Sequence, residues 1–350
     1  MGPRLRGDDK IVGGDDKIVG GDDKIVGGDD KKKNRVSEME SSKTQAKITC
    51  AILCISFSTL CLADTLIIEP DAGQTPLLNA IHHAESSIDV AMYGFTDKTF
   101  MKALAAESAS GKKIRILLQR MPYKASHEND SAIHFFEKTP ISLKWPDDTF
   151  RYFHQKTFLF DRSRAFVMTF NLTHSSFFTE RNFALEITDP ALVNEIQNVF
   201  DADRAHHAVS VRQSRLIWSP DNSRIKLSKI IQNAKTHILV ETESLSDDNI
   251  IGLLAKAAEK HISVDVLLSS QPREGIIHYL TKAGVVIHQS HHYIIHAKIM
   301  IIDNAQAVIG SINLTKPSLD DNRELSVITT DKKVIDALAE TFQKDWVTSS

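Results

Sequence analysis

Apolar residues recur along this chain in two long stretches that follow the same order. Residues 77–119 begin with an amphipathic pattern typical of a helix and continue with the apolar run IDVAMYGF, typical of a buried strand. An Asp then precedes an Ala/Leu-rich segment, which predicts a helix, and the run KIRILLQ predicts a second strand. Residues 227–269 repeat this order with the runs HILVETES and SVDVLLS. Alternating helices and strands predict an α/β layered architecture.

The repetition continues downstream of both stretches. Residues 151–173, RYFHQKTFLFDRSRAFVMTFNLT, align with residues 293–315, YIIHAKIMIIDNAQAVIGSINLT, and His, Lys, Asp, Asn and Thr fall in register 142 residues apart. Each copy then closes with a helical pattern. We therefore predict two halves that arose by gene duplication, residues 64–212 and 213–350, with the stretch RQSRLIWSPDNSR as the linker between them.

The first 38 residues have a different character. Residues 7–30 repeat GDDKIVG with a period of seven, and Ile-Val is the only apolar content of each repeat. No face of this segment is apolar enough to be buried in a coiled coil. We therefore expect residues 1–38 to be a disordered extension outside the fold.

Residues 39–63 have the pattern of a secretory signal peptide. A start at Met39 gives a short segment with two lysines, followed by sixteen uncharged residues that end at Ala63. A transmembrane anchor is the alternative, although about twenty apolar residues are needed to span a bilayer. Cleavage after Ala63 predicts a secreted or periplasmic protein.

Charge and cysteine content limit the function classes. Of the 42 Lys/Arg and 45 Asp/Glu, residues 1–63 hold 11 and 10, so the rest of the chain holds 31 and 35 and is mildly acidic. A protein that binds many nucleic-acid phosphates is usually basic, so only a local basic cleft is compatible with such a partner. Cys50, Cys54 and Cys61 all precede residue 64, which leaves the predicted fold without a disulfide framework or a cysteine nucleophile.

The aligned segments carry the pattern H-x-K-x4-D followed by N-x-T. A His and a Lys two residues apart on a strand point to the same face. There the Lys can bind phosphate oxygens, the imidazole can attack phosphorus or transfer a proton, and the Asn adds an amide donor. The candidate site residues from the two copies are His154, Lys156, Asn171, His296, Lys298 and Asn313.

These motifs, HQKTFLFD and HAKIMIIDN…GSINLT, resemble the paired H-K-D signatures of the phospholipase D superfamily. The resemblance covers residues 64–350. It implies two α/β sandwich halves related by pseudo-twofold symmetry, with one active site between them. It also implies a mechanism without metal or other cofactor, in which one His forms a covalent phosphohistidine and the other protonates the leaving alcohol.

The first half departs from the family pattern. Met168 and Thr169 stand where the second half has Gly310 and Ser311, and Asn182 stands where the second half has Glu324, which in the family orients the histidine.

We expect Glu324 beside His296 and Asn182 beside His154. A carboxylate raises the pKa of a neighbouring imidazole, so this pairing predicts His154 as the nucleophile and His296 as the general acid. Both lysines and both asparagines would hold the phosphate oxygens, with Ser311 as a further substrate contact.

Other residues leave alternatives open. Asp161 and Asp303 complete the motif at the strand ends, where accepting backbone hydrogen bonds is as reasonable as catalysis. Three histidines allow a metal site but lack a carboxylate at ligand spacing, and four aromatic residues near the motifs belong to the core or to a substrate surface. These two sets are His288, His291 and His292, and Trp145, Phe177, Phe178 and Trp218.

The motifs do not identify the phosphodiester. We expect a phospholipase D that acts on phospholipid at a membrane surface and leaves phosphatidic acid, because of the export signal and the mildly acidic chain. A secreted or periplasmic endonuclease acting on DNA or RNA is the alternative, since no large lipid-binding insertion is visible. Decay into a binding module is a third interpretation. With both half-sites on one chain, the protein is expected to be a monomer.

Overall fold

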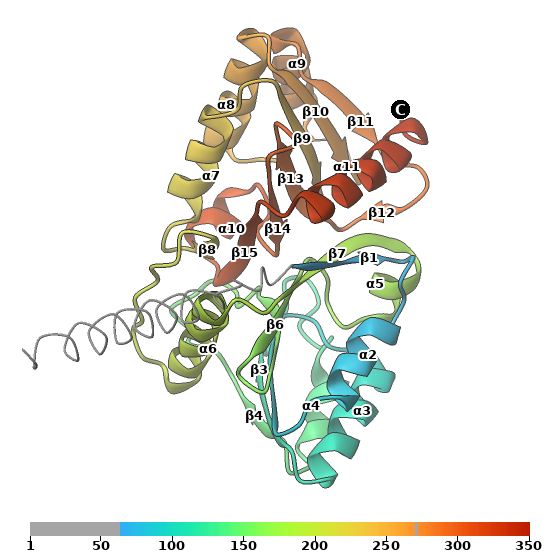
Figure 1. Ribbon diagram of the computed structural model, residues 1–350, viewed down its shortest axis with the longest axis vertical. Coiled ribbons are helices and arrows are strands. Elements are labelled where there is room, and N and C mark those ends of the chain that lie inside the picture. The colour runs from blue at the N-terminus through green and yellow to red at the C-terminus, as the bar shows by residue number, and fades with distance from the viewer. Residues whose placement is uncertain (1–63, 270–271) are drawn as a thin grey trace, which may run out of the picture. The chain divides into compact units, whose positions relative to one another are not determined.

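Two mixed β-sheets organise the protein (Figure 1). The computed structural model describes residues 64–269 and 272–350, and these belong to one compact unit. The predicted repeat extension and signal peptide lie outside the described residues. No helix in the described part of the chain has the length and apolar character to cross a bilayer.

The first sheet has the strand order β1-β7-β6-β5-β2-β3-β4, and β12 from the second half also pairs with β7. Strands β2, β3 and β4 are parallel, whereas β5, β6, β7 and β1 pair antiparallel. Its elements are β1 (Thr65–Glu69), α2 (Thr75–His82), β2 (Ser87–Met92), α3 (Lys98–Ala109), β3 (Lys113–Leu118), α4 (Asp130–Phe136), β4 (Ser142–Lys144), β5 (Lys156–Phe160), β6 (Arg164–Met168), α5 (His174–Phe178), β7 (Glu180–Ile187) and α6 (Pro190–Ala205).

The second sheet repeats this plan in the order β11-β10-β9-β13-β14-β15-β8. The second half contains β8 (Leu216–Ser219), α7 (Ser223–Gln232), β9 (His237–Thr242), α8 (Asp248–Glu259), β10 (Ser263–Leu268), α9 (Glu274–Ala283), β11 (Val286–Gln289), β12 (Ile294–Ile295), β13 (Lys298–Ile302), β14 (Gln306–Gly310), α10 (Lys316–Asp320), β15 (Glu324–Thr329) and α11 (Lys332–Val347), of which β12 joins the first sheet. The predicted α/β architecture with two similar halves is therefore confirmed.

The predicted linker needs correction. Its central residues, Leu216–Ser219, form β8, which pairs antiparallel with β15 at the edge of the second sheet. All four of these residues are buried, because the apolar run LIWS supplies an edge strand rather than a solvated connection.

Aspartates begin the helices that follow the central strands. Asp97 and Asp247 accept hydrogen bonds from backbone N–H groups in the first turns of α3 and α8, and Asp189 and Asp331 do the same for α6 and α11. These side chains satisfy N–H groups that have no partner inside the helix. The Asp at the start of α3 and of α8 was predicted from the sequence.

Three apolar cores account for the layers. One core belongs to the first half alone, under α2, α3 and α4 on one face of its sheet, and a second belongs to the second half alone, under α7, α8 and α9 (Figure 1). The third core combines the other faces of both sheets with α6 and α11. Since this core contains residues of both halves, burial of apolar surface holds the halves together.

Backbone pairing also joins the halves at two equivalent places. β12 of the second half pairs with the start of β7, and Phe153 forms an isolated β-bridge with Arg323. As a result, the backbone N–H of His154 donates to the carbonyl of Arg323 (2.9 Å), and that of His296 donates to the carbonyl of Arg181 (3.1 Å). Each motif histidine is thus fixed by a strand of the opposite half.

Two buried ion pairs follow the same crossed pattern. Arg181 in β7 contacts Asp345 in α11 at 2.6 Å, and Arg323, just before β15, contacts Asp203 in α6 at 3.0 Å. All four side chains are at most 6% exposed. Arg181 and Arg323 are 142 residues apart, as are Asp203 and Asp345, so the contacts between the halves repeat as the sequence does.

Candidate active site

Both motif histidines line one cleft with a volume of about 480 Å³. His154 comes two residues before the start of β5, and His296 lies between β12 and β13. Each histidine is therefore just before its motif strand rather than within it. The cleft is lined by Tyr93, Tyr123, Arg151, Tyr152, His154, Asn171, Glu243, Ser246, His296, Asn313, Thr315, Pro317, Ser318 and Asn322.

The His154 ring is held by a carboxylate of the other half. Its Nδ1 lies 2.8 Å from Oε2 of Glu324, whose side chain is fully buried. The other oxygen of Glu324 accepts hydrogen bonds from Ser318 (2.6 Å) and Asn322 (2.9 Å). A carboxylate in this position accepts a hydrogen bond from Nδ1–H, so the neutral ring presents the lone pair of Nε2 for reaction.

The His296 ring is held by an amide. Its Nδ1 lies 3.0 Å from Oδ1 of Asn182. The amide orientation follows from its other contacts, since Nδ2 of Asn182 donates to Glu180 (3.0 Å) and Oδ1 accepts from Thr169 (2.8 Å). The carboxylate of Glu180 is 3.8 Å from the same ring nitrogen. Each Nδ1 atom thus has a carboxylate nearby, but only that of Glu324 is within hydrogen-bond distance of its ring, that of His154.

The predicted pairing of Glu324 with His296 and of Asn182 with His154 is wrong. Each orienting residue faces the histidine of the other half, because β7 pairs with β12 across the junction and Arg323, just before β15, forms a bridge with Phe153. The electrostatic reason for the predicted roles of the histidines therefore fails. A different reason has to come from the observed contacts.

The two halves carry the same pair of residue types in opposite order. The first half has Glu180 and Asn182, and the second has Asn322 and Glu324 at the aligned positions. In each half the amide of Asn donates to the neighbouring Glu, at 3.0 Å and 2.9 Å. This inversion is visible in the aligned sequence, but its meaning depends on which of the two residues reaches a ring, and only the structure shows that.

The motif lysines lie behind the histidines. The ammonium of Lys156 donates to the carbonyl of His154 (2.9 Å), and that of Lys298 donates to the carbonyl of His296 (2.7 Å). Burial lowers the pKa of Lys156 to about 7, with a further contribution from the charge of Lys298. Since the charge of Lys298 disfavours that of Lys156, an anion near both would stabilise the two charges, and we call this lysine pair the anion site.

Burial also lowers the pKa of both imidazoles. For His154 the charge of Lys156 adds to the effect of burial, whereas Glu324 opposes it. For His296 the pKa lies well below its usual range, because burial acts together with the charge of Lys298. Burial and the lysine charges thus oppose a positive charge on either ring, whereas Glu324 favours one on His154 and Glu243 favours one on His296.

Two residues of the site were missed in the sequence. Tyr93 and Glu243 follow the strand residues that pair with Lys156 and Lys298, so they are equivalent positions. The Tyr93 ring lies 4.6 Å from the His154 ring and 5.0 Å from the Lys156 ammonium. Glu243 forms an ion pair with Lys298 at 2.7 Å. The equivalent segments AMYG (91–94) and ETES (241–244) show this difference, since the second has two glutamates where the first has Ala and Tyr.

The motif asparagines reach the cleft, whereas Ser311 does not. Asn171 accepts a hydrogen bond from the N–H of Gly94 (3.2 Å), and Asn313 donates to Glu243 (3.3 Å). Ser311 is fully buried and exchanges hydrogen bonds with the backbone of Leu325 (3.2 and 3.3 Å). The predicted contact of Ser311 with substrate is therefore not supported, because its hydroxyl joins β14 to β15.

The motif aspartates are structural. Asp161 accepts backbone hydrogen bonds from Glu85, Ser86 and Ser87, and Asp303 accepts those of Lys235, Thr236 and His237. Both stand at hairpin turns with positive φ (53° and 56°), a conformation that Asp tolerates. Neither lines the cleft, which decides between the two roles left open by the sequence.

The histidines considered as metal ligands do not converge. His288 stacks on Trp346 with ring centroids 3.9 Å apart, and His291 contacts Ser350 at 2.8 Å. Within residues 64–269 and 272–350, no group of three or more His, Cys, Asp or Glu side chains could hold a metal ion.

The aromatic residues singled out from the sequence lie outside the cleft. Phe177 and Trp218 are buried in the cores, and Phe178 is exposed. The aromatic side chains that do line the cleft are Tyr93, Tyr123 and Tyr152.

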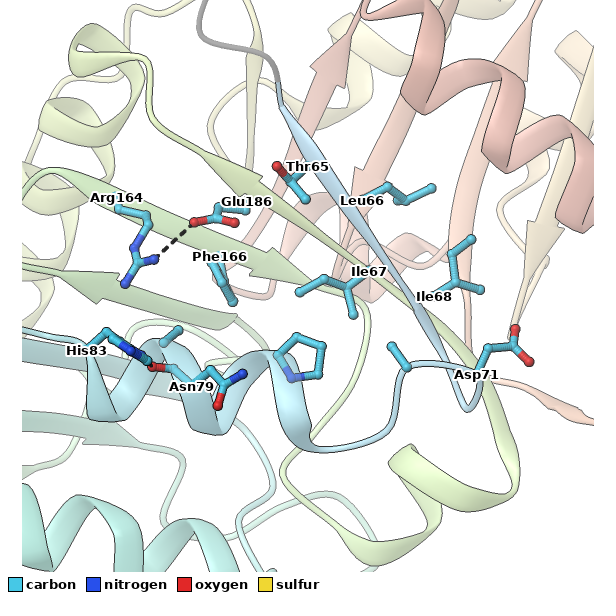
Figure 2. Close-up of a pocket in the computed structure, with 13 residues that line it drawn as sticks. Thr65, Leu66, Ile67, Ile68, Asp71, Asn79, His83, Arg164, Phe166 and Glu186 are labelled. Carbon is cyan, nitrogen blue, oxygen red and sulfur yellow. Dashed lines mark hydrogen bonds and ion pairs between the residues drawn. The ribbon is translucent and has the colours of Figure 1, made fainter.

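A second groove, with a volume of about 590 Å³, lies along β1 and α2 (Figure 2). Its lining is largely apolar, with an ion pair between Arg164 and Glu186 at 3.3 Å. None of the motif residues lines this groove, so the repeated chemistry belongs to the first cleft alone among the described residues.

Comparison with known proteins agrees with this architecture. A family model described as the PLD-like domain of cardiolipin synthase matches residues 77–204 and 227–346. Cardiolipin synthase B of Escherichia coli is 22% identical over 280 residues, which are 67% of this chain and 67% of that protein. Cardiolipin synthase B of Salmonella typhi is 22% identical over 244 residues, which are 60% of this chain and 59% of that protein, so this chain spans about three fifths of that relative.

Solved structures share the fold. Phosphatidylserine synthase of Haemophilus influenzae superposes with a TM-score of 0.65 at 10% identity, over 82% of this chain and 87% of that chain. Polyphosphate kinase from Porphyromonas gingivalis gives a TM-score of 0.66 at 17% identity, over 80% of this chain and 46% of that one. The family model covers both motif-bearing halves, and the chain belongs to the phospholipase D superfamily.

Proposed function

We propose that this protein is a phospholipase D-type phosphodiesterase that removes phospholipid head groups through a phosphohistidine on His154, with phosphatidic acid as the product when water is the acceptor. The names of the relatives, which are cardiolipin synthases, favour a phospholipid substrate and make an alcohol a second possible acceptor. The observation that carries the proposal is the crossed support of two imidazoles in one cleft, which leaves Nε2 of each ring for reaction.

The contacts assign different roles to the rings. Glu324 accepts a hydrogen bond from Nδ1–H of His154 and stabilises the positive charge that this ring acquires when Nε2 bonds to phosphorus. His296 has a neutral amide at Nδ1, but its Nε2 lies 3.6 Å from the carboxylate of Glu243, which favours a proton on that nitrogen. His154 is thus suited to attack and His296 to proton transfer, for reasons that differ from the sequence-based argument.

The reaction takes two steps, formation of the phosphohistidine and its hydrolysis. The lone pair of His154 Nε2 forms a bond to phosphorus, the bond to the head-group oxygen breaks, and His296 gives that oxygen its Nε2 proton. Neutral His296 next removes a proton from water, whose oxygen bonds to phosphorus as the bond to His154 breaks. Lys156, Lys298 and the two motif asparagines would stabilise the charge on the non-bridging oxygens.

The test is mass spectrometry of enzyme that is rapidly quenched during turnover of a soluble, short-chain phosphatidylethanolamine. We expect a phosphatidyl adduct on the peptide with His154, and its loss in His154→Ala together with at least about 10³-fold of the turnover rate. His296→Ala should still form the adduct from a p-nitrophenyl ester, whose leaving group needs no proton. An adduct on His296 alone would reverse the roles.

An endonuclease remains the second candidate because of the cleft mouth. Arg151 lies 5.9 Å from the Tyr152 ring and Lys124 lies 5.1 Å from the Tyr123 ring, so cationic and aromatic groups alternate there as in single-strand binding grooves. Plasmid nicking that falls steeply with salt and disappears in His154→Ala would support this candidate. Head-group release without nicking would exclude it.

We also propose that the protein is exported, with the first mature residue at Asp64. The support is the charged and then apolar pattern of residues 39–63. N-terminal sequencing of protein from the periplasm or the medium should begin at Asp64. Retention of the chain in the cytoplasm with Met1 or Met39 intact would contradict export.

A further inference from the structure

A carboxylate occupies the second half of the proposed phosphate site. Oε2 of Glu243 lies 2.7 Å from the ammonium of Lys298 and 3.3 Å from Nδ2 of Asn313. The same oxygen is 3.6 Å from Nε2 of His296. These three groups are the ones to which the proposed function assigns a phosphate oxygen and the leaving group.

The first half has no such anion at the equivalent position. Met92 pairs with Lys156, and Thr242 pairs with Lys298, so the next residues, Tyr93 and Glu243, correspond. Tyr93 covers Lys156 with its ring, and its hydroxyl accepts a hydrogen bond from the backbone N–H of Tyr123 (2.6 Å). One lysine of the anion site is therefore covered by a neutral ring, and the other is neutralised by a carboxylate.

The charges around Glu243 favour its anionic form. Burial alone would raise the pKa of this carboxyl, but the charges of Lys298 and His296 outweigh burial and hold the pKa well below its usual range. A non-bridging oxygen of a phosphodiester is also an anionic acceptor and seeks the same ammonium and amide donors. The carboxylate and the phosphate oxygen cannot occupy one position together.

We propose that Glu243 fills the place of a substrate phosphate oxygen in the free enzyme and has to leave Lys298 and Asn313 when phosphate binds. This inference rests on the proposed phosphodiesterase function, from which the phosphate position comes. The Glu243 side chain is 37% exposed, so it can turn toward the open cleft. There His296 is the remaining cationic partner, and the displaced carboxylate stabilises the proton on Nε2 that the leaving group takes.

The experiment measures binding of inorganic phosphate by isothermal titration, which needs no turnover. The variants are Glu243→Gln, which removes the charge, and Glu243→Tyr, which copies the first half. We expect both to bind phosphate about tenfold more tightly than the wild type. The matched control is Glu180→Gln, which removes a carboxylate 3.8 Å from the same histidine but away from Lys298, and should change the affinity less than about twofold.

Each outcome decides the matter. Unchanged or weaker phosphate binding in folded Glu243→Gln, with folding checked by thermal melting, overturns the inference, because the carboxylate would then organise Lys298 rather than compete for it. An equal gain in Glu180→Gln also overturns it, since a general charge effect would explain both. If the wild type releases no head group but Glu243→Gln gains phosphate affinity, the proposed function fails, whereas the competition of Glu243 with phosphate for Lys298 stands.

Discussion

The two halves of this protein share a sheet order and a His-Lys pair, yet they distribute charge differently. In the first half Tyr93 covers the lysine and an amide reaches across the junction to the other ring. In the second half Glu243 neutralises the lysine and a carboxylate reaches across. Duplication supplied two equal half-sites, and a few substitutions beside the motifs made them unequal. This inequality suits one ring to nucleophilic attack and the other to proton transfer.

The largest expected difference between the halves comes from substituting the two residues that bind Nδ1 of the histidine rings. Glu324→Gln should lower kcat by about 10³-fold, because His154 loses the charge that stabilises its cationic adduct. Asn182→Ala should cost only about tenfold, since it removes a neutral orienting contact from His296. Steady-state kinetics on both variants measures the difference. Equal losses would show that the inverted Glu and Asn do not separate the roles of the rings.

A second test concerns the crossed ion pairs, where the halves are alike. Asp203→Ala and Asp345→Ala should each lower the free energy of unfolding by about 3 kcal/mol, because each leaves a buried guanidinium without its main partner. Urea denaturation measures both. Glu340→Ala, which breaks an exposed pair with Lys344, is the control and should leave the midpoint unchanged. A loss at one Asp only would show that the junction is asymmetric.

A third and smaller test uses pH. Lys156 must be protonated to bind phosphate, and its pKa of about 7 in the free enzyme places a limit there. As pH rises through this value the lysine loses its proton, so kcat/KM should fall about tenfold per pH unit above it. Lys156→Arg should move this limb to higher pH, because arginine keeps its charge. Lys298→Arg should leave this fall in kcat/KM at the same pH, because Glu243 already pairs with Lys298. A shift of the fall to higher pH in Lys298→Arg as well would show that the two lysines act alike.

The sequence predicted the fold and the motif residues because both depend on local patterns that occur twice. Helices, strands and the positions of His154, Lys156, His296 and Lys298 followed from periodicity and register. The pairing of Glu324 and Asn182 with the rings did not, because it depends on strands that cross between the halves. Ser311 was misplaced for a similar reason, since its hydroxyl bonds to a neighbouring strand.

The crossed support of the rings has a consequence for how such an enzyme can be assembled. Two copies of the second half alone would give each His296 a Glu324 from its partner copy and hence two identical rings held by carboxylates. Two copies of the first half would give two rings held by amides. Only one copy of each yields unlike rings, so the covalent link between the halves fixes their ratio at one to one and with it the division of chemical labour.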